Sequence, residues 1–220
     1  MPRSESEYYK YQPNIVEKIS WSARMKMFES LVQMAQPTAE TTVLDVGVTS
    51  ERRESTNFFE KLYPYTHNIT AVAIEDACFL EKEYPGLKFI KADGLHLPFA
   101  DKSFHLVVSF ATIEHVGSRD EQRRFISELC RVGDAICIST PNRWYPIEFH
   151  TVLPFVHWFP SAWFHSIGKW LGKDFYATED NLNLLSERDV LHMLPPDAKV
   201  STRHFRLFGL ISNLMFYAKT

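Results

Sequence analysis

Apolar runs of strand length alternate with stretches of helical periodicity along most of this chain. The apolar runs are rich in β-branched residues and bounded by turn residues, which is typical of buried strands. Five such runs are present, at residues 42–47, 69–74, 87–91, 104–110 and 135–140. Between them, apolar residues at helical spacing predict helices at 15–36, 58–62, 78–84 and 120–132, with cap residues for the second at 55–57. Strands that alternate with helices form a parallel sheet with right-handed crossovers.

The alternation breaks after the fifth strand, where residues 144–176 are dense in aromatic side chains and hold four of the five tryptophans. The pattern resumes with a helix at 181–193, with Ser186 as its N-cap, and with strands at 199–205 and 210–218 that predict an antiparallel hairpin at the sheet edge. We therefore expect an α/β protein with a Rossmann-like, seven-stranded, mostly parallel sheet. Helices should cover both faces, the last strand should be antiparallel, and an aromatic helical insertion should follow strand five.

Composition narrows the class of protein and its partners. A net charge of −3 and a pI near 6.3, with Lys and Arg scattered, give no basic footprint for nucleic acid. The three cysteines form no CxxC pair, so we expect reduced thiols rather than disulfides or a zinc site. The N-terminus lacks an apolar signal core, and no run reaches the roughly 18 apolar residues of a membrane span. We expect a cytoplasmic, single-domain protein that does not bind nucleic acid.

Acidic residues stand at the ends of the first three predicted strands, and a Glu-His pair follows the fourth. These residues are Asp45, Glu75, Asp76, Asp93, Glu114 and His115. The carboxyl ends of neighbouring parallel strands meet at one edge of an open sheet, where ligands bind in a crevice. Carboxylates in that place suit the hydroxyl groups of a ribose. The order of elements therefore predicts a nucleoside-binding α/β enzyme.

Residues 93–116, DGLHLPFADKSFHLVVSFATIEHV, carry the most specific signal in the chain. They resemble the D-x-x-x-L-P-F-x-D-x-S-F-D…E-H-V signature of class I S-adenosylmethionine-dependent methyltransferases, in the branch that acts on small molecules. The resemblance covers about residues 42–140, and the following TPNRWYPIEFH resembles a segment of bacterial members encoded near envelope-polysaccharide genes. It divides the single domain 1–220 into an N-terminal helical extension (1–40), a cofactor-binding core (41–140), an aromatic lid or subdomain (141–180), and a final helix and strands (181–220).

The resemblance implies that residues at the strand ends bind the cofactor, S-adenosylmethionine. They are Asp45, Gly47, Thr49, Glu75, Asp76, Asp93, Gly94, Leu95, Ser109 and Phe110. Asp45 and Gly47 would lie under the methionine part, and Glu75 would hold both ribose hydroxyls. Asp93 would accept from the adenine amino group, and Ser109 would line the methyl-transfer end. Each carboxylate also has a structural interpretation, as a cap or a turn residue.

Two departures from the family pattern bear on the cofactor. The glycine-rich turn G-x-G-x-G keeps only its first glycine, Gly47, although the hydroxyls of Thr49 and Ser50 could hydrogen-bond a ligand. In one alignment the acidic position of strand two falls on Ala73, and Glu75 lies two residues later on the same face. A dinucleotide needs close backbone amides for its pyrophosphate, so the lost glycines count more against a nicotinamide cofactor than against S-adenosylmethionine.

His150, beside Glu148, and His115 are candidate catalytic bases for a hydroxyl acceptor, because imidazole titrates near neutral pH. The alternative for each is a structural role. The other histidines show no ligand spacing, so the sequence predicts no metal site. The aromatic segment permits three interpretations: a helical subdomain with its own core, a lid over the acceptor, or a patch in weak contact with a membrane surface.

The predicted function is methyl transfer from S-adenosylmethionine to a small-molecule acceptor. An oxygen of a sugar or of another ring-containing compound, lipid-linked compounds included, fits the aromatic segment and the weak charge. The alternative is a catalytically silent, methyltransferase-like scaffold that acts through a partner, which the altered turn motivates. A nicotinamide-dependent dehydrogenase is a second alternative, and the sequence leaves the oligomeric state open.

Overall fold

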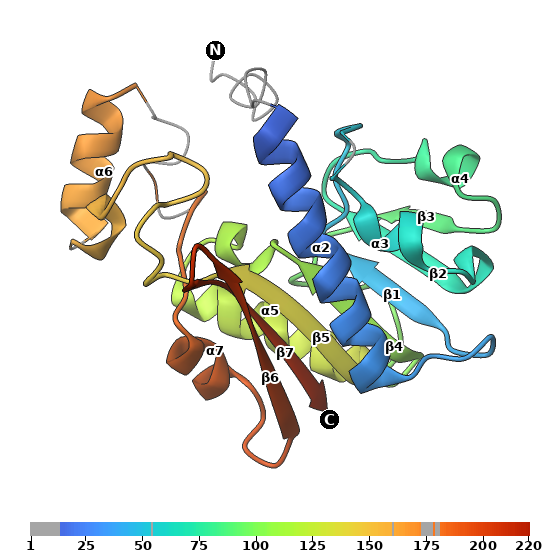
Figure 1. Cartoon of the computed structure of the whole chain (residues 1–220). Coiled ribbons are helices and arrows are strands. Elements are labelled where there is room, and N and C mark those ends of the chain that lie inside the picture. Colours follow the sequence, from blue (N-terminus) through green and yellow to red (C-terminus); the bar gives the residue numbers. More distant parts are fainter. Residues whose placement is uncertain (1–13, 54, 160, 173–177, 179–180) are drawn as a thin grey trace.

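Seven strands form one sheet that organises the described part of the chain, residues 14–53, 55–159, 161–172, 178 and 181–220 (Figure 1). In this computed structural model the strands are β1 (Val43–Val46), β2 (Ile69–Ala73), β3 (Lys88–Lys91), β4 (Phe104–Phe110), β5 (Gly133–Pro141), β6 (Lys199–Leu207) and β7 (Leu210–Lys219). Their order is β3-β2-β1-β4-β5-β7-β6, and β7 runs antiparallel to both of its neighbours. The predicted Rossmann-like α/β sheet with an edge hairpin is confirmed. Residues 1–13 of the expected extension, and Phe175 and Tyr176, lie outside the described residues.

Helices cover both faces of the sheet, as the alternation predicts (Figure 1). One face carries α2 (Asn14–Ala35), α3 (Phe58–Leu62) and α4 (Leu80–Glu83), and the other carries α5 (Arg119–Val132) and α7 (Glu187–Met193). Successive strand residues point to opposite faces, so Leu44 packs with Phe125 of α5 whereas its neighbour Val43 packs with Phe59 of α3. The sheet therefore separates two hydrophobic cores, and β1 is buried on both sides.

The predicted helix at 181–193 is wrong in its first half, because tertiary contacts use that backbone. The Asn183 N–H donates to the Glu114 carbonyl at 2.7 Å, and the Arg143 N–H donates to the Leu185 carbonyl at 3.0 Å. These bonds hold the segment against the loops that follow β4 and β5. α7 begins only after Ser186, which caps it as expected.

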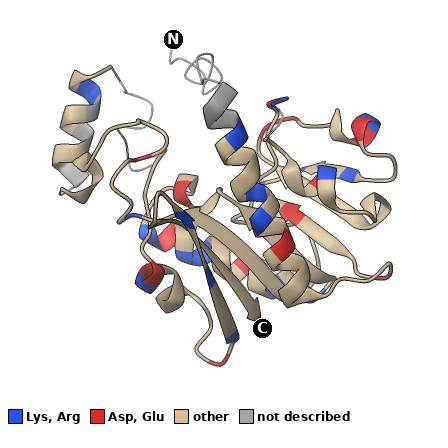
Figure 2. Cartoon of the chain, in the orientation of Figure 1, with Lys and Arg blue, Asp and Glu red and all other residues tan. Residues whose placement is uncertain are grey.

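The aromatic segment after β5 lies beside the sheet (Figure 1). Its helices are η3 (Val156–Trp158) and α6 (Ser161–Trp170). Phe164 packs with Leu182 and Leu184 in a small cluster of its own, whereas Trp163 and Trp170 are exposed. Charged residues of both signs are spread over the elements of the fold (Figure 2). Among the described helices, none combines the length and apolar composition needed to cross a membrane.

Two buried carboxyl groups connect β1 to α3. Because side chains alternate along a strand, Asp45 points with Val43 toward α3, where Glu60 is also buried. Neither oxygen of Glu60 meets a hydrogen-bond donor among the described residues, and its neighbour is the Asp45 carboxyl. Burial, and then the charge of Glu60, raise the pKa of Asp45 well above its usual value, and burial raises the pKa of Glu60. Since burial and the repulsion between two neighbouring carboxylates both favour the neutral form, the pair favours a state in which at least one carboxyl is protonated.

Glu60→Gln will make folding stability less dependent on pH. In the wild type the pKa values of Asp45 and Glu60 are raised on folding, so their contribution to stability is full below their ordinary pKa values of 3.8 and 4.5 and is lost as the pH rises. An amide at position 60 carries no charge and can donate to Asp45 at every pH. Urea denaturation at about pH 5 and about pH 8 should therefore give a smaller loss of stability in the variant. Equal losses in both proteins would contradict a contribution of Glu60 to this pH dependence.

Ser118→Ala will lower the free energy of unfolding by about 1 kcal/mol, because it removes the N-cap of α5. The Ser118 hydroxyl accepts from the Glu121 N–H at 3.3 Å, and the Glu121 carboxylate accepts from the Ser118 N–H at 2.8 Å. Ser118→Thr keeps the hydroxyl and is the matched control. Urea denaturation measures both, and a similar loss in the threonine variant would assign the effect to something other than the cap.

Candidate functional site

The carboxyl ends of β1 and β4 lie next to each other, at the point where the strand order reverses. β1 pairs with β2 on one side and with β4 on the other. In open α/β sheets, ligands bind outside the carboxyl ends of the strands at this reversal. Gly47 lets the loops that follow β1 and β4 touch, because any Cβ at this position would overlap with the Thr112 side chain and its φ is 103°. These two loops therefore frame the candidate site.

Side chains fix the turn after Gly47, where the family uses glycines. The Asn57 amide accepts from the Thr49 N–H and donates to the Thr49 carbonyl, both at 2.9 Å. The Thr49 hydroxyl accepts from the Glu51 N–H at 3.2 Å, and the Thr56 hydroxyl donates to the Glu51 carbonyl at 2.9 Å. The expected cap role of Asn57 is wrong: it has a φ of 48° at the start of α3 and makes no cap hydrogen bond. Its side chain holds the turn instead.

The acidic residues after β2 have separate tasks. Glu75 is exposed, and its Oε2 accepts from the Ser50 hydroxyl at 2.7 Å, which connects the ends of β1 and β2. Asp76 accepts from the Cys78 N–H at 2.9 Å and thereby closes the turn before α4. Hydrogen bonds from Cys78 lower the pKa of Asp76. Glu75 therefore keeps an exposed carboxylate, whereas the Asp76 carboxylate stabilises the turn.

Asp93 stands at the end of β3 with its side chain 49% exposed. Its Oδ1 accepts from the Leu95 N–H at 2.9 Å, which is the turn interpretation, while Oδ2 faces His96 at 3.8 Å. Gly94 lies against the core, because a Cβ there would meet Phe125, and Leu95 is half-buried against the same core. Asp93 therefore keeps a carboxylate oxygen open to solvent, whereas Gly94 and Leu95 face the core.

The end of β4 turns its side chains inward. Ser109 is buried, and its hydroxyl donates to the Val46 carbonyl at 2.8 Å, so it bridges β4 and β1. The ring of Phe110 lies 4.8 Å from the ring of Phe58 and packs with the core on the α3 face. Asp45 is likewise buried toward α3. These three residues shape the floor beneath the loops and do not project into solvent.

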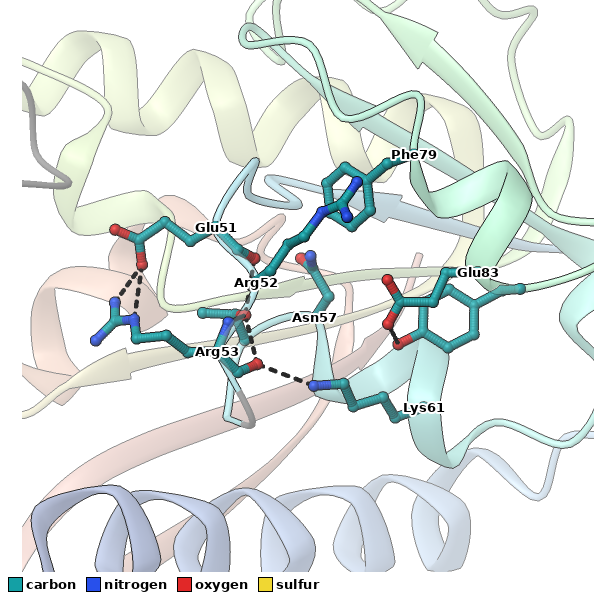
Figure 3. A pocket seen from close by; sticks show the side chains of 9 residues that line it. Glu51, Arg52, Arg53, Asn57, Lys61, Phe79 and Glu83 are labelled. Carbon is teal, nitrogen blue, oxygen red and sulfur yellow. Dashed lines mark hydrogen bonds and ion pairs between the residues drawn. The ribbon is translucent and has the colours of Figure 1, made fainter. Parts of the chain in front are cut away.

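A cavity of about 180 Å³ opens beside the β1–α3 loop, on the side of α4 (Figure 3). The Arg52 guanidinium lies 4.2 Å from the centre of the Phe79 ring, and Arg53 pairs with Glu51. Lys61 donates to the Arg53 carbonyl at 3.0 Å. Glu75 and Asp93 do not line this cavity. It is a charged hollow next to the site that the sequence predicts.

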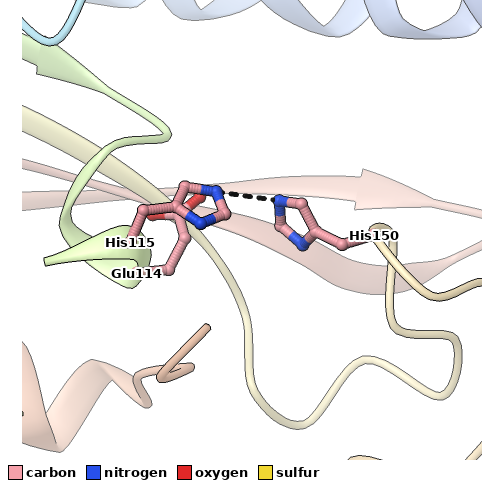
Figure 4. Close-up of side chains that lie close together, drawn as sticks. All are labelled: Glu114, His115 and His150. Atoms are coloured by element: carbon pink, nitrogen blue, oxygen red, sulfur yellow. Dashed lines mark hydrogen bonds between the residues drawn. The ribbon is translucent and has the colours of Figure 1, made fainter. Parts of the chain in front are cut away.

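His115 and His150 meet at the same edge of the sheet although 35 residues separate them (Figure 4). His115 ends η2 (Ile113–His115) after β4, and His150 comes from the segment after β5. Their Nε2 atoms are 3.1 Å apart and their ring planes are nearly perpendicular, at 87°. Burial, and then the nearby His150, lower the pKa of His115. The structure thus brings together both residues that the sequence offers as catalytic bases.

Buried carboxylates stand next to both imidazoles. Glu148 accepts from His150 Nδ1 at 2.6 Å, from the His150 N–H at 2.8 Å and from the Thr151 hydroxyl at 2.6 Å. Burial by itself would raise the pKa of Glu148, but His150 and these hydrogen bonds lower it to about 2. Glu114 is fully buried, and its Oε2 accepts from the Thr140 hydroxyl at 3.0 Å. Glu148 therefore contacts His150 directly, and Glu114 lies buried beside the histidine pair rather than in solvent.

Sequence reasoning gave no role to Asn57 in the turn, to Glu60 or to Glu114 as a neighbour of His150. A charged residue directly after two phenylalanines, in FFEKL, was a signal for Glu60. The position of Glu114 next to His115 in the sequence was a signal for Glu114. The partners of all three come from other elements, and spacing along the chain does not reveal them.

The residues at the strand ends fit an adenosyl group. Glu75 and Asp93 offer exposed carboxylate oxygens at the ends of adjacent strands, and ribose hydroxyls and an adenine amino group are the donors that such oxygens accept. The turn after Gly47 is fixed by Asn57 and Thr56, so it does not need further glycines to keep its shape. The carboxylate acceptors at the strand ends therefore match the hydroxyl and amino donors of a nucleoside.

Comparison with known proteins agrees with this geometry. A family model described as a methyltransferase domain matches residues 44–134. A protein of Mycobacterium tuberculosis, described as a probable S-adenosylmethionine-dependent methyltransferase, is 36% identical over 67 residues. The aligned part is 29% of this chain and 23% of that relative, so the chain matches about a quarter of the relative's length.

Solved structures show the same fold at low identity. Magnesium protoporphyrin IX methyltransferase from Synechocystis PCC 6803, with bound S-adenosylhomocysteine, has a TM-score of 0.60 at 15% identity and covers 96% of this chain and 90% of its own. The N-methyltransferase NodS from Bradyrhizobium japonicum WM9, in complex with S-adenosylhomocysteine, has a TM-score of 0.55 at 13% identity and covers 89% and 86%. Residues 44–134 therefore match a methyltransferase domain, and the fold is that of S-adenosylmethionine-dependent methyltransferases.

Proposed function

We propose that this protein transfers a methyl group from S-adenosylmethionine to an oxygen of a small-molecule acceptor. The observation that carries the proposal is the Glu148–His150–His115 chain of contacts at the edge where the cofactor of this family binds. An imidazole held by a carboxylate is suited to take a proton from a hydroxyl group. The acceptor we propose is a sugar or another ring-containing compound, free or lipid-linked.

The cofactor contacts are assigned to residues at three strand ends. Glu75 holds the ribose hydroxyls, and Asp93 accepts from the adenine amino group, since both keep exposed carboxylate oxygens. Gly47 and Thr49 form the turn against which the methionine part lies, and Asp45 supports this turn from below. When bound, S-adenosylmethionine supplies a methyl group activated by its sulfonium, so the protein's task is mainly alignment.

His150 is assigned as the base, and His115 as the residue that orients it. The buried Glu148 carboxylate lies 2.6 Å from His150 Nδ1, which places the ring's proton on Nδ1 and leaves Nε2 as the acceptor. His115 Nε2 lies 3.1 Å from His150 Nε2 and helps to hold the His150 ring in place. The negative charge of Glu148 stabilises the imidazolium that forms.

The aromatic segment supplies the surface for the acceptor. The ring of Phe149, just before His150, stacks on the buried ring of Tyr145, with 5.1 Å between the ring centres. The ring centres of Trp144 and Trp158 are 6.5 Å apart. Flat rings next to a candidate base suit a sugar or an aromatic ring. The exposed Trp163 would also suit weak contact with a membrane surface that carries a lipid-linked acceptor. The described residues of the segment after β5 act in this proposal as a subdomain or lid over the acceptor.

Glu75→Ala and Asp93→Ala will each weaken binding of S-adenosylhomocysteine by about tenfold or more, because a hydrogen bond to a charged group contributes roughly 1.5–3 kcal/mol. Isothermal titration calorimetry measures the dissociation constant. Asp134→Ala is the matched control, since Asp134 is an exposed carboxylate at the opposite end of the sheet. Unchanged affinity in both site variants would overturn the assignment. No binding by the wild type would favour the silent scaffold that acts through a partner.

His150→Ala will lower the rate of methyl transfer by about 10²- to 10⁴-fold, the usual contribution of a general base, while affinity for S-adenosylhomocysteine stays unchanged. The assay offers methyl-labelled S-adenosylmethionine with a panel of sugars and ring-containing alcohols, free and lipid-linked, and identifies the product by mass spectrometry. His204→Ala is the control, because His204 lies on β6 and pairs at the surface with Glu187 of α7. A rate in the His150 variant equal to that of the control would remove His150 from the reaction.

A further inference from the structure

Three potential metal ligands converge at the carboxyl edge of the sheet. Glu114 and His115 come from η2 after β4, and His150 comes from the segment after β5 (Figure 4). One ligand atom from each lies within 4.8 Å of the others. We propose that Glu114, His115 and His150 bind a divalent transition-metal ion of the zinc type. The proposal does not depend on methyl transfer, because the ion can be detected by binding alone.

The two imidazoles are held in the tautomer that a metal needs. His115 Nδ1 lies 2.7 Å from the Asn181 carbonyl oxygen, and His150 Nδ1 lies 2.6 Å from the Glu148 carboxylate. Both partners only accept hydrogen bonds, so each neutral ring carries its proton on Nδ1 and its lone pair on Nε2. Ligating histidines in metal sites are oriented by such contacts to carbonyls and carboxylates.

The distance between the Nε2 atoms suits two ligands of one ion. Two lone pairs 3.1 Å apart repel unless a positive charge lies between them. Nitrogens bound to a tetrahedral zinc ion at roughly 2.0–2.1 Å lie about 3.3 Å from each other. The observed distance is close to that value, and the 87° between the ring planes lets both lone pairs point to one place without a clash of the rings.

Glu114 supplies the second, independent reason for a cation. Its side chain is fully buried; Oε2 accepts from the Thr140 hydroxyl, but Oε1 meets no hydrogen-bond donor within the part of the chain that the structure describes. A buried carboxylate oxygen without a partner is costly, and a bound cation removes that cost. Together with Glu148 behind His150, Glu114 brings two negative charges, which match a divalent ion.

The ligand set indicates which ion fits and what it would do. Two imidazole nitrogens and one carboxylate oxygen favour zinc-like transition metals over Mg²⁺, which prefers oxygen ligands. Three protein ligands leave a coordination position open, as in catalytic zinc sites. A hydroxyl group bound there would lose its proton more readily. His150 Nε2 would then be a ligand, and coordination would replace the proton acceptance proposed for this residue.

The site departs from the expectation that the chain has no metal ligands. Ligand spacing along the sequence gave no signal, because His115 and His150 are 35 residues apart and meet only through the path of the chain from β4 to the segment after β5. The Glu-His pair at 114–115 was visible, but its third member was not.

Titration of the full chain with Co²⁺ and Zn²⁺ tests the proposal. The protein is first treated with a chelator to remove any bound metal, and the chelator is then removed. We expect one Co²⁺ per chain, a visible absorption band of Co²⁺ bound by nitrogen ligands, and displacement by Zn²⁺. His150→Ala and Glu114→Gln should each weaken binding by more than about tenfold. His204→Ala removes the histidine of the exposed pair with Glu187 and should bind like the wild type.

Several outcomes would overturn the site. Absence of the Co²⁺ band in the wild type would mean that the two rings share only a proton, and equal affinity in His150→Ala would place the ion elsewhere. If Glu114→Gln does not fold, His115→Ala takes its place. Titration of the same proteins with S-adenosylhomocysteine separates the two proposals. Metal binding without cofactor binding would remove the proposed function and keep the site, and cofactor binding without metal would do the reverse.

Discussion

The parallel pairing of β1 with β4 is the constraint on which the rest of the structure depends. It reverses the strand order and brings the loops after these two strands into contact, with Thr112 in the space that a side chain at Gly47 would need. Every candidate residue is placed relative to this contact. Glu75 and Asp93 follow from the strands on one side of it, and His115 and His150 from those on the other. The cofactor-binding end and the reacting end of the proposed site would thereby share one edge of the sheet.

Polar side chains hold the turn after Gly47, where the family's turn uses the backbone freedom of glycines. The family's glycine-rich turn depends on residues that adopt unusual backbone angles at little cost. Here the Asn57 amide and the Thr56 hydroxyl hold the turn by hydrogen bonds to its backbone, and Ser50 connects it to Glu75. A turn fixed in this way is less adaptable but already ordered, which lowers the entropy lost when a ligand binds. The departure from the family pattern is thus compatible with cofactor binding.

The proposed base and the proposed metal site both use the lone pair on His150 Nε2. His150 Nε2 can accept a proton from a hydroxyl group or it can ligate a cation, and the same Glu148 contact supports both uses. In either proposal, the acceptor oxygen would become more nucleophilic next to the methyl donor. The half-buried ring of Phe149, which precedes His150 and stacks on the buried Tyr145, would give such an acceptor an apolar contact. The acceptor class and the chemistry at this edge are therefore consistent with each other.

Local pattern determined most of the fold, and tertiary contacts decided most of the site. Strand and helix periods, turn residues and the hydroxyl caps depend on neighbours a few residues away, so the sheet, its hairpin and the Ser186 cap could be predicted from the sequence. The sequence also predicted His115 and His150, each by itself, as candidate catalytic bases. Their meeting, the burial of Ser109 and the pairing of Asp45 with Glu60 depend on which strand lies beside which and on which face a side chain points. Those relations join residues far apart along the chain, and only the folded sheet brings them together.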